Sequence, residues 1–440
     1  MPDSSALPPV RSYRLPGLAV EEYRVPVPLD HFGRGEAGEA AAGEGWQLEV
    51  FARVVGTPGS EKPYLLYLQG GPGSEAFRPT ASDPAWLPRA LEDFRVVMLD
   101  QRGTGLSGAI GIVDDRVTGV PASLAEAPRT DPQIVALAEH LTHYRADAIV
   151  EDAEYVRKAL GVDTWSVLGQ SFGGFCTLRY VQEHPDALDA AYFTGGLPAV
   201  GPSLWEVYSR TWRIMETKSR RFAAEHPESA EALRALAARV TESPLALPDG
   251  TLAGPAHVRA LGHLLGASGG AEKLHYLLEL PIDSAAFRHD LLAVQPFGAR
   301  NPLYAAVHES CWANGEASEW TAEAVMPEAF RTDPTLLAGE HIARDFFTSG
   351  PLAAWEDVAH VVASVEWPVM WEAEKLRSSE VPAAAAIYFE DAFVPLEFSV
   401  PTADLLPGMR RWVTSEYEHN GLRASGPTVL DHLVRLVRGM

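Results

Sequence analysis

Short apolar runs alternate with amphipathic segments over the first 200 residues of the chain. Each apolar run stops at glycine or another turn-forming residue, which is typical of a buried strand. The predicted strands are 46–55, 63–69, 94–100 and 164–169. Apolar residues at helical spacing predict helices at 85–94, 146–161 and 171–185. Strands that alternate with helices in this way indicate an α/β fold with a mostly parallel sheet.

The pattern changes near residue 201, where long helical segments such as 204–227 follow one another without a convincing buried strand. Strand patterns return at 382–395 and 409–422, and an amphipathic helix ends the chain. We therefore expect a core formed by residues 1–200 and 356–440, interrupted by a helical cap at 201–355.

Composition and charge exclude several classes of protein. The chain has 440 residues, 46% of them hydrophobic, but no apolar window long enough for a membrane span and no signal-peptide pattern at its start. Its 59 acidic and 36 basic residues give a net charge of −23, which disfavours a nucleic-acid partner. The only cysteines, Cys176 and Cys311, have no paired spacing, so we expect no disulfide framework or zinc site and a cytoplasmic location.

Two copies of the pattern glycine-x-serine-x-glycine compete as the position of a nucleophile, at Ser171 and at Ser268. Ser171 follows a predicted strand and opens a predicted helix, the context in which a sharp turn raises a serine hydroxyl above the edge of a sheet. Ser268 has helical sequence on both sides, so its glycines are better explained by the end of a helix and a loop. Ser171 is therefore the predicted nucleophile.

A serine hydroxyl needs a base to take its proton and a carboxylate to orient that base. For a serine at such a turn, the acid and then the histidine should follow in the sequence, each just beyond a late strand. Asp391 and His419 satisfy this order. The neighbouring Glu390 is the rival acid, but one step earlier on the strand it would point to the opposite face. His432, on the terminal helix, is expected to be structural.

The segment Gln69-Gly70-Gly71-Pro72-Gly73 follows the strand at 63–69, where glycines leave a backbone N–H open towards a substrate carbonyl. We expect the N–H groups of Gly71 and Phe172 to form an oxyanion hole.

Three motifs in this order, QGGPG (69–73), DQRGTGLS (100–107) and GQSFGG (169–174), resemble those of the prolyl aminopeptidases, or proline iminopeptidases. These enzymes are serine peptidases of the α/β-hydrolase fold. The resemblance is closest to the larger members and extends over nearly the whole chain, including 301–310, 338–341 and the segment around His419. The first motif departs from the common form, because Gln69 stands where histidine is usual.

The resemblance implies that the helical insertion caps the active site and that cap carboxylates bind the free amino group of a peptide substrate. Glu309 is the first candidate for this role and Glu340 the second, with Glu279 behind both. It also implies release of an N-terminal residue, preferably proline, through an acyl-enzyme, with neither metal nor organic cofactor.

Three other functions stay open. Residues 103–108 match the glycine pattern of a dinucleotide site, although no clear helix follows them. A non-enzymatic binding protein on the same scaffold would have no need for Ser171, Asp391 and His419 together. Closer alternatives keep the fold and the nucleophile: an esterase, amidase or lactonase for small molecules, or an aminopeptidase for a residue other than proline.

Overall fold

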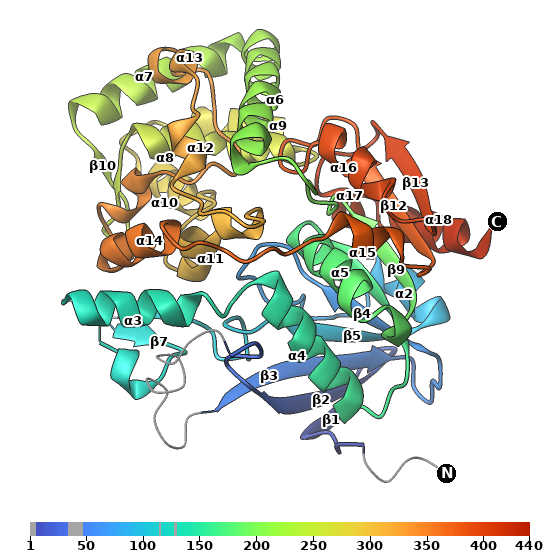
Figure 1. Cartoon of the computed structure of the whole chain (residues 1–440). Coiled ribbons are helices and arrows are strands. Elements are labelled where there is room, and N and C mark those ends of the chain that lie inside the picture. The colour runs from blue at the N-terminus through green and yellow to red at the C-terminus, as the bar shows by residue number, and fades with distance from the viewer. Residues whose placement is uncertain (1–5, 34–46, 114–115, 127–129) are drawn as a thin grey trace.

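The structure, a computed structural model, describes residues 6–33, 47–113, 116–126 and 130–440 (Figure 1). Its centre is a nine-stranded sheet with the order β1-β2-β3-β5-β4-β8-β9-β12-β13. The strands are β1 (Arg11–Leu15), β2 (Leu18–Val27), β3 (Leu48–Gly56), β4 (Tyr64–Leu68), β5 (Arg95–Asp100), β8 (Trp165–Gln170), β9 (Leu188–Thr194), β12 (Ala383–Tyr388) and β13 (Met409–Thr414).

Every neighbouring pair from β5 to β13 is parallel, whereas the pairs from β1 to β5 are antiparallel. This confirms the predicted mostly parallel sheet and the strands predicted within it, apart from Trp46, which lies outside the described residues. The strands β1, β2 and β9 were not predicted from the sequence. In β2 the run Glu21-Glu22 and the residues Arg24 and Pro26 break the apolar pattern of a buried strand.

Helices cover both faces of the sheet, and Figure 1 shows the two helices of one face, α4 and α5. Helices α4 (Ala146–Ala159) and α5 (Phe172–Glu183) pack on one face, and α2 (Leu87–Asp93) and α18 (Thr428–Arg438) on the other. Successive residues of a strand point to opposite faces, so Leu66 joins the first core and Leu65 the second. Both are fully buried, which explains the continuous apolar run of β4.

Between β9 and β12 the chain leaves the sheet and forms a mostly helical layer over the carboxyl ends of the strands (Figure 1). Only the two-residue strands β10 (Leu245–Ala246) and β11 (Leu252–Ala253) are found among its described residues. Its helices are α6 (Leu204–Glu225), α7 (Pro227–Glu242), α8 (Pro255–Arg259), α9 (Gly270–Leu278), α10 (Ala285–Ala293), α11 (Pro302–Val307), α12 (Thr321–Ala324), α13 (Glu328–Thr332) and α14 (Glu356–Ala363).

The last of these helices, α14, packs against α11 and against α3 (Asp131–Leu141), and it lies just beyond residue 355. The boundaries of the cap at 201 and 355 stay predictions. None of the helices in the described residues is long and apolar enough to span a bilayer.

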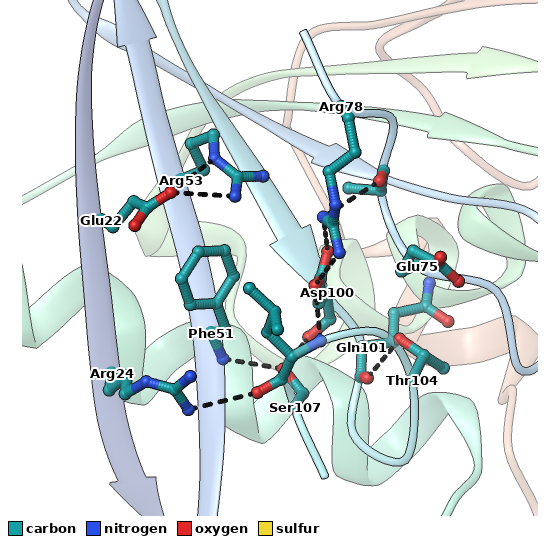
Figure 2. A network of polar contacts seen from close by, with 12 residues as sticks. Glu22, Arg24, Phe51, Arg53, Glu75, Arg78, Asp100, Gln101, Thr104 and Ser107 are labelled. Atoms are coloured by element: carbon teal, nitrogen blue, oxygen red, sulfur yellow. Dashed lines mark hydrogen bonds and ion pairs between the residues drawn. The ribbon is translucent and has the colours of Figure 1, made fainter. Parts of the chain in front are cut away.

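The DQRGTGLS motif forms a turn that folds back on Asp100, the last residue of β5 (Figure 2). The Asp100 carboxylate accepts hydrogen bonds from Arg78 at 2.8 and 2.9 Å and from the Leu106 N–H at 2.9 Å. Ser107 donates to the Asp100 carbonyl at 2.6 Å and accepts from the N–H of Phe51 at 2.7 Å. The turn therefore ties β5 to β3 and to the loop after β4.

The glycines at 103–108 serve this turn and not a dinucleotide. Gly105 has φ +50°, and a Cβ there would collide with the Asp100 carboxylate and lie 2.6 Å from the Cβ of Glu75. No helix opens behind the turn: the chain continues into the strands β6 (Gly111–Val113) and β7 (Arg116–Thr118). A pyrophosphate would thus find no helix N-terminus at this position.

We predict that Gly105→Ala lowers the thermal unfolding midpoint much more than Gly17→Ala. Both residues have positive φ, +50° and +76°, so both substitutions add a backbone penalty of about 1–2 kcal/mol. Gly17 has open space where a Cβ would lie, whereas at Gly105 the added atom displaces the Asp100 carboxylate. Calorimetry of the two variants checks this, and equal shifts would contradict it.

Candidate active site

Ser171 occupies the sharp turn between β8 and α5, with φ +54° and ψ −127°. Its neighbours can approach so closely only because they are glycines. A Cβ on Gly169 would collide with the Gly173 carbonyl, one on Gly173 with the Leu68 carbonyl, and one on Gly196 would lie 2.5 Å from the Ser171 carbonyl. The glycines of GQSFGG thus let strand and helix meet, and the serine between them is held at the carboxyl end of the central strand.

His419 and Asp391 come to Ser171 from the loops after β13 and β12. His419 Nε2 lies 2.8 Å from Ser171 Oγ, and His419 Nδ1 lies 2.8 and 3.0 Å from the two Asp391 carboxylate oxygens. Asp391 Oδ1 also accepts the N–H groups of Phe393 and Val394, each at 2.9 Å. The structure therefore joins the three predicted residues in one chain of hydrogen bonds.

Burial lowers the pKa of His419, but the charge of Asp391 and its hydrogen bond outweigh burial and raise the pKa above its ordinary value. The rival acid Glu390 faces away from this site. Its carboxylate makes two hydrogen bonds of 2.7 Å with Arg221 of α6, as expected for a residue on the opposite side of the chain.

Ser268, the second candidate nucleophile, lies in the cap loop that holds the His419 segment. The His419 N–H donates to the Gly266 carbonyl at 3.1 Å, the Ser268 N–H donates to Asn420 Oδ1 at 2.9 Å, and Ser268 Oγ accepts the Glu418 N–H at 3.4 Å. Ser268 follows a 3₁₀ segment (Ala260–Gly266) and precedes α9, which agrees with the predicted helix end and loop. Its hydroxyl therefore supports the histidine loop.

The groups predicted as an oxyanion hole lie beside Ser171. Gly71 lines the same cavity as Ser171, and Phe172 is the next residue in the chain. Among the hydrogen bonds of the described residues, none uses the N–H of Gly71 or Phe172 as donor, which leaves both available. The N–H of Gly70 is occupied, because it donates to the Gln69 side chain at 3.0 Å. Gln69 Oε1 also accepts from Tyr67 at 2.6 Å, so the unusual residue of the first motif orders this loop.

A cavity of about 290 Å³ opens over Ser171, between the core and the cap. This volume is at the small end of ligand cavities, which span about 300–1,000 Å³. Both layers contribute its walls, and its lining includes Gly71, Ser171 and His419 from the core together with His263, Tyr304 and Glu340 from the cap.

Of the three cap carboxylates, the structure brings Glu340 to the cavity. Glu340 lines it and accepts a hydrogen bond of 2.7 Å from Tyr304. Glu309 does not line the cavity: its buried carboxylate accepts the Ala322 N–H of α12 at 2.8 Å, and desolvation raises its pKa to about 7. Glu279 is exposed and lies 3.4 Å from His275. Glu309 therefore contacts the N-terminus of α12, and the structure places it outside the lining of the cavity.

One group of described side chains has the spacing to hold a metal ion, namely His226, Glu228 and His275. It lies where α6 meets α7 and on α9, and none of its members lines the cavity over Ser171.

Sequence reasoning missed several residues of the cavity wall. His263 stacks on Phe393 with ring centroids 5.0 Å apart, and Phe393 meets the His419 ring edge-on at the same distance. Arg423, four positions after His419, also lines the cavity. Their proximity follows from docking of the cap, which no local pattern encodes; only the closeness of Arg423 to His419 in the sequence could have pointed to it.

Comparison with known proteins agrees with this geometry. The α/β hydrolase fold family matches residues 63–276. A proline iminopeptidase of Aeromonas sobria is 37% identical over 97% of this chain and 98% of its own length. A proline iminopeptidase of Aspergillus aculeatus is 29% identical over 95% of this chain and 99% of its own length. These full-length similarities, together with a serine, a histidine and an aspartate joined at the edge of a mostly parallel sheet, show that the chain belongs to the proline iminopeptidase family of α/β hydrolases.

Proposed function

We propose that the protein is a serine aminopeptidase that releases N-terminal proline from peptides, with Ser171 as nucleophile, His419 as general base and acid, and Asp391 as the carboxylate that orients the histidine. The observation that carries these roles is the hydrogen-bond chain from Ser171 Oγ through His419 to Asp391, each link 2.8 Å at its shortest. Near-full-length similarity to two proline iminopeptidases supports the reaction.

In this mechanism His419 Nε2 takes the proton of Ser171 Oγ as the oxygen attacks the carbonyl carbon of the N-terminal residue. The imidazolium then gives the proton to the leaving nitrogen, which departs as an amine and leaves an acyl-enzyme. Water, deprotonated by the same histidine, releases the free amino acid. Asp391, fixed by the N–H groups of Phe393 and Val394, keeps Nδ1 protonated and stabilises the imidazolium.

Negative charge develops on the carbonyl oxygen during both steps. The N–H groups of Gly71 and Phe172 have no acceptor among the described residues, and they would donate hydrogen bonds to this oxygen. All steps use backbone amides and three side chains, so we propose that the reaction needs neither metal nor organic cofactor.

Glu340 supports the choice of an aminopeptidase. A free α-amino group is cationic below about pH 8, and a carboxylate in a confined cavity can hold it by a charge-assisted hydrogen bond. Glu340 is the cap carboxylate that lines the cavity, and Tyr304 fixes one of its oxygens. We therefore assign the amino group of the substrate to Glu340 in place of Glu309. The partner is a peptide or small molecule with a free N-terminus, and the two unpaired cysteines favour a cytoplasmic location.

Ser171→Ala should lower kcat by about four orders of magnitude, because the nucleophile is lost while the cavity is kept. A proline arylamide measures the rate, and circular dichroism checks the fold. A fluorophosphonate should label Ser171 in the parent protein, and it should still label Ser171 in Ser268→Ala. A label on Ser268, or near-normal turnover by Ser171→Ala, would contradict the assignment.

The raised pKa of His419 predicts where activity disappears in acid. The base must be neutral, so kcat/KM should fall as the pH falls through a value above about 6.5, the ordinary pKa of histidine. In Asp391→Asn the stabilising charge is absent, so the residual activity should be far lower and its acid limb should move to lower pH. An unmoved acid limb in that variant would mean that a different group controls it.

Glu340→Gln should impair hydrolysis of proline arylamide much more than hydrolysis of a phenyl ester without an amino group. The charge-assisted hydrogen bond at stake corresponds to roughly 10- to 150-fold in kcat/KM. The matched variant Glu309→Gln should leave this substrate ratio unchanged, because Glu309 bonds to a helix N-terminus. If Glu340→Gln affects both substrates equally, or if the parent prefers N-acetylproline arylamide, the esterase or amidase alternative replaces the aminopeptidase.

A further inference from the structure

The cavity over Ser171 carries a positive charge that the reaction described above does not use. Arg423 lies on the short helix α17 (Gly421–Ala424) and lines the cavity together with Ser171 and His419. Its side chain is exposed, and its guanidinium lies over the ring of Phe77 at 5.9 Å from the centroid. Within the part of the chain that the structure describes, it forms no ion pair with a carboxylate.

Glu418, the carboxylate nearest to Arg423 in the sequence, already has a cation, because it binds Lys218 at 2.6 Å. An arginine that stays unpaired at the cavity of a protein with a net charge of −23 is therefore available to an anion from outside.

Arg423 and Glu340 both act on the histidines of the cavity, with opposite signs. Burial is the largest influence on the pKa of His263 and of His419; in addition, Glu340 acts to raise both pKa values and Arg423 acts to lower them. The cavity thus holds one negative and one positive group, each within electrostatic reach of the base that serves the reaction.

The two charges match the two sides of the scissile bond of a peptide substrate, the N-terminal residue on one side and the leaving residue on the other. The amino group precedes the scissile carbonyl and falls to Glu340 under the proposed function. The leaving nitrogen must come within hydrogen-bond reach of His419 Nε2 to receive its proton. Arg423 lies on the helix that follows His419 and lines the same cavity, so its guanidinium is among the groups that the leaving residue can reach.

We propose that Arg423 binds a carboxylate of the leaving residue, so that the enzyme favours short peptides, dipeptides above all, whose second residue carries a free carboxylate. In a dipeptide this group is two bonds from the scissile nitrogen, and a guanidinium can hold it with two parallel hydrogen bonds. The side-chain carboxylate of an acidic second residue could bind Arg423 in the same way, although it lies more bonds away from the scissile nitrogen. The inference rests on the proposed function of the same site.

The test measures kcat/KM for two matched pairs of substrates at pH 8. Pro-Gly against Pro-Gly-amide reports recognition of the α-carboxylate, and Pro-Glu-amide against Pro-Gln-amide reports recognition of an acidic side chain. The parent protein should prefer the carboxylate member of at least one pair by about tenfold, as a charge-assisted hydrogen bond implies. The pair that shows the preference identifies the source of the carboxylate.

In Arg423→Gln, the ratio of kcat/KM between the carboxylate and the neutral member of the preferred pair should fall to the value set by the intrinsic reactivity of the two leaving groups. Arg423→Lys should retain part of the preference. Comparing ratios between variants removes any general loss of rate that follows from a changed pKa of His419. Arg410→Gln, which removes an equal charge from β13 outside the cavity lining, should keep the parent ratio.

The outcomes separate this inference from the proposed function. Equal ratios in the parent and in Arg423→Gln would overturn the carboxylate site, while release of proline from the arylamide would leave the aminopeptidase standing. Failure to release proline from every substrate, the arylamide included, would overturn both.

Discussion

The active site depends on one strained backbone conformation, that of Ser171. Its φ of +54° is costly for a residue with a side chain, by about 1–3 kcal/mol, and persists only where the surroundings fix it. Here the surroundings are glycines: Gly173 touches the strand β4 and Gly174 meets Gly196 after β9, at distances that exclude a Cβ. Strand, serine and helix consequently cannot shift independently, and the hydroxyl keeps its position relative to the N–H of Phe172.

The histidine, by contrast, is positioned by both layers of the protein. Asp391 of the core orients its ring, while the cap loop at 266–268 accepts the N–H groups of Glu418 and His419 and donates to the side chain of Asn420. The fit is tight, because a Cβ on Gly266 would collide with the ring of Phe393, which itself meets the ring of His419. The helical layer therefore helps to position His419 in addition to lining the cavity, and a displaced layer would disturb the histidine as well as the cavity.

The sequence predicts those strands and site residues whose pattern lies within one short segment, and it misses those that depend on packing between distant segments. Ser171, Asp391 and His419 could be found because each follows a recognisable strand, and chain order supplied the rest. The strand β2 was missed because its charges hide the apolar alternation. The sequence ranked Glu309 ahead of Glu340, because no local pattern encodes where the short segments of the cap pack. In the structure Glu309 turns to the N-terminus of α12, and Glu340 to Tyr304 and the cavity.

Under the proposed function, the charges of the cavity account for the selectivity of a common hydrolase site. The triad and the two free N–H groups act on any ester or amide carbonyl, so they carry no preference for an N-terminus. Selectivity must come from groups that meet the substrate at either side of the scissile bond; under the proposals above these are Glu340 and Arg423, which both line the cavity. A zwitterionic dipeptide would offer a counter-charge to both groups, whereas a neutral ester would offer one to neither.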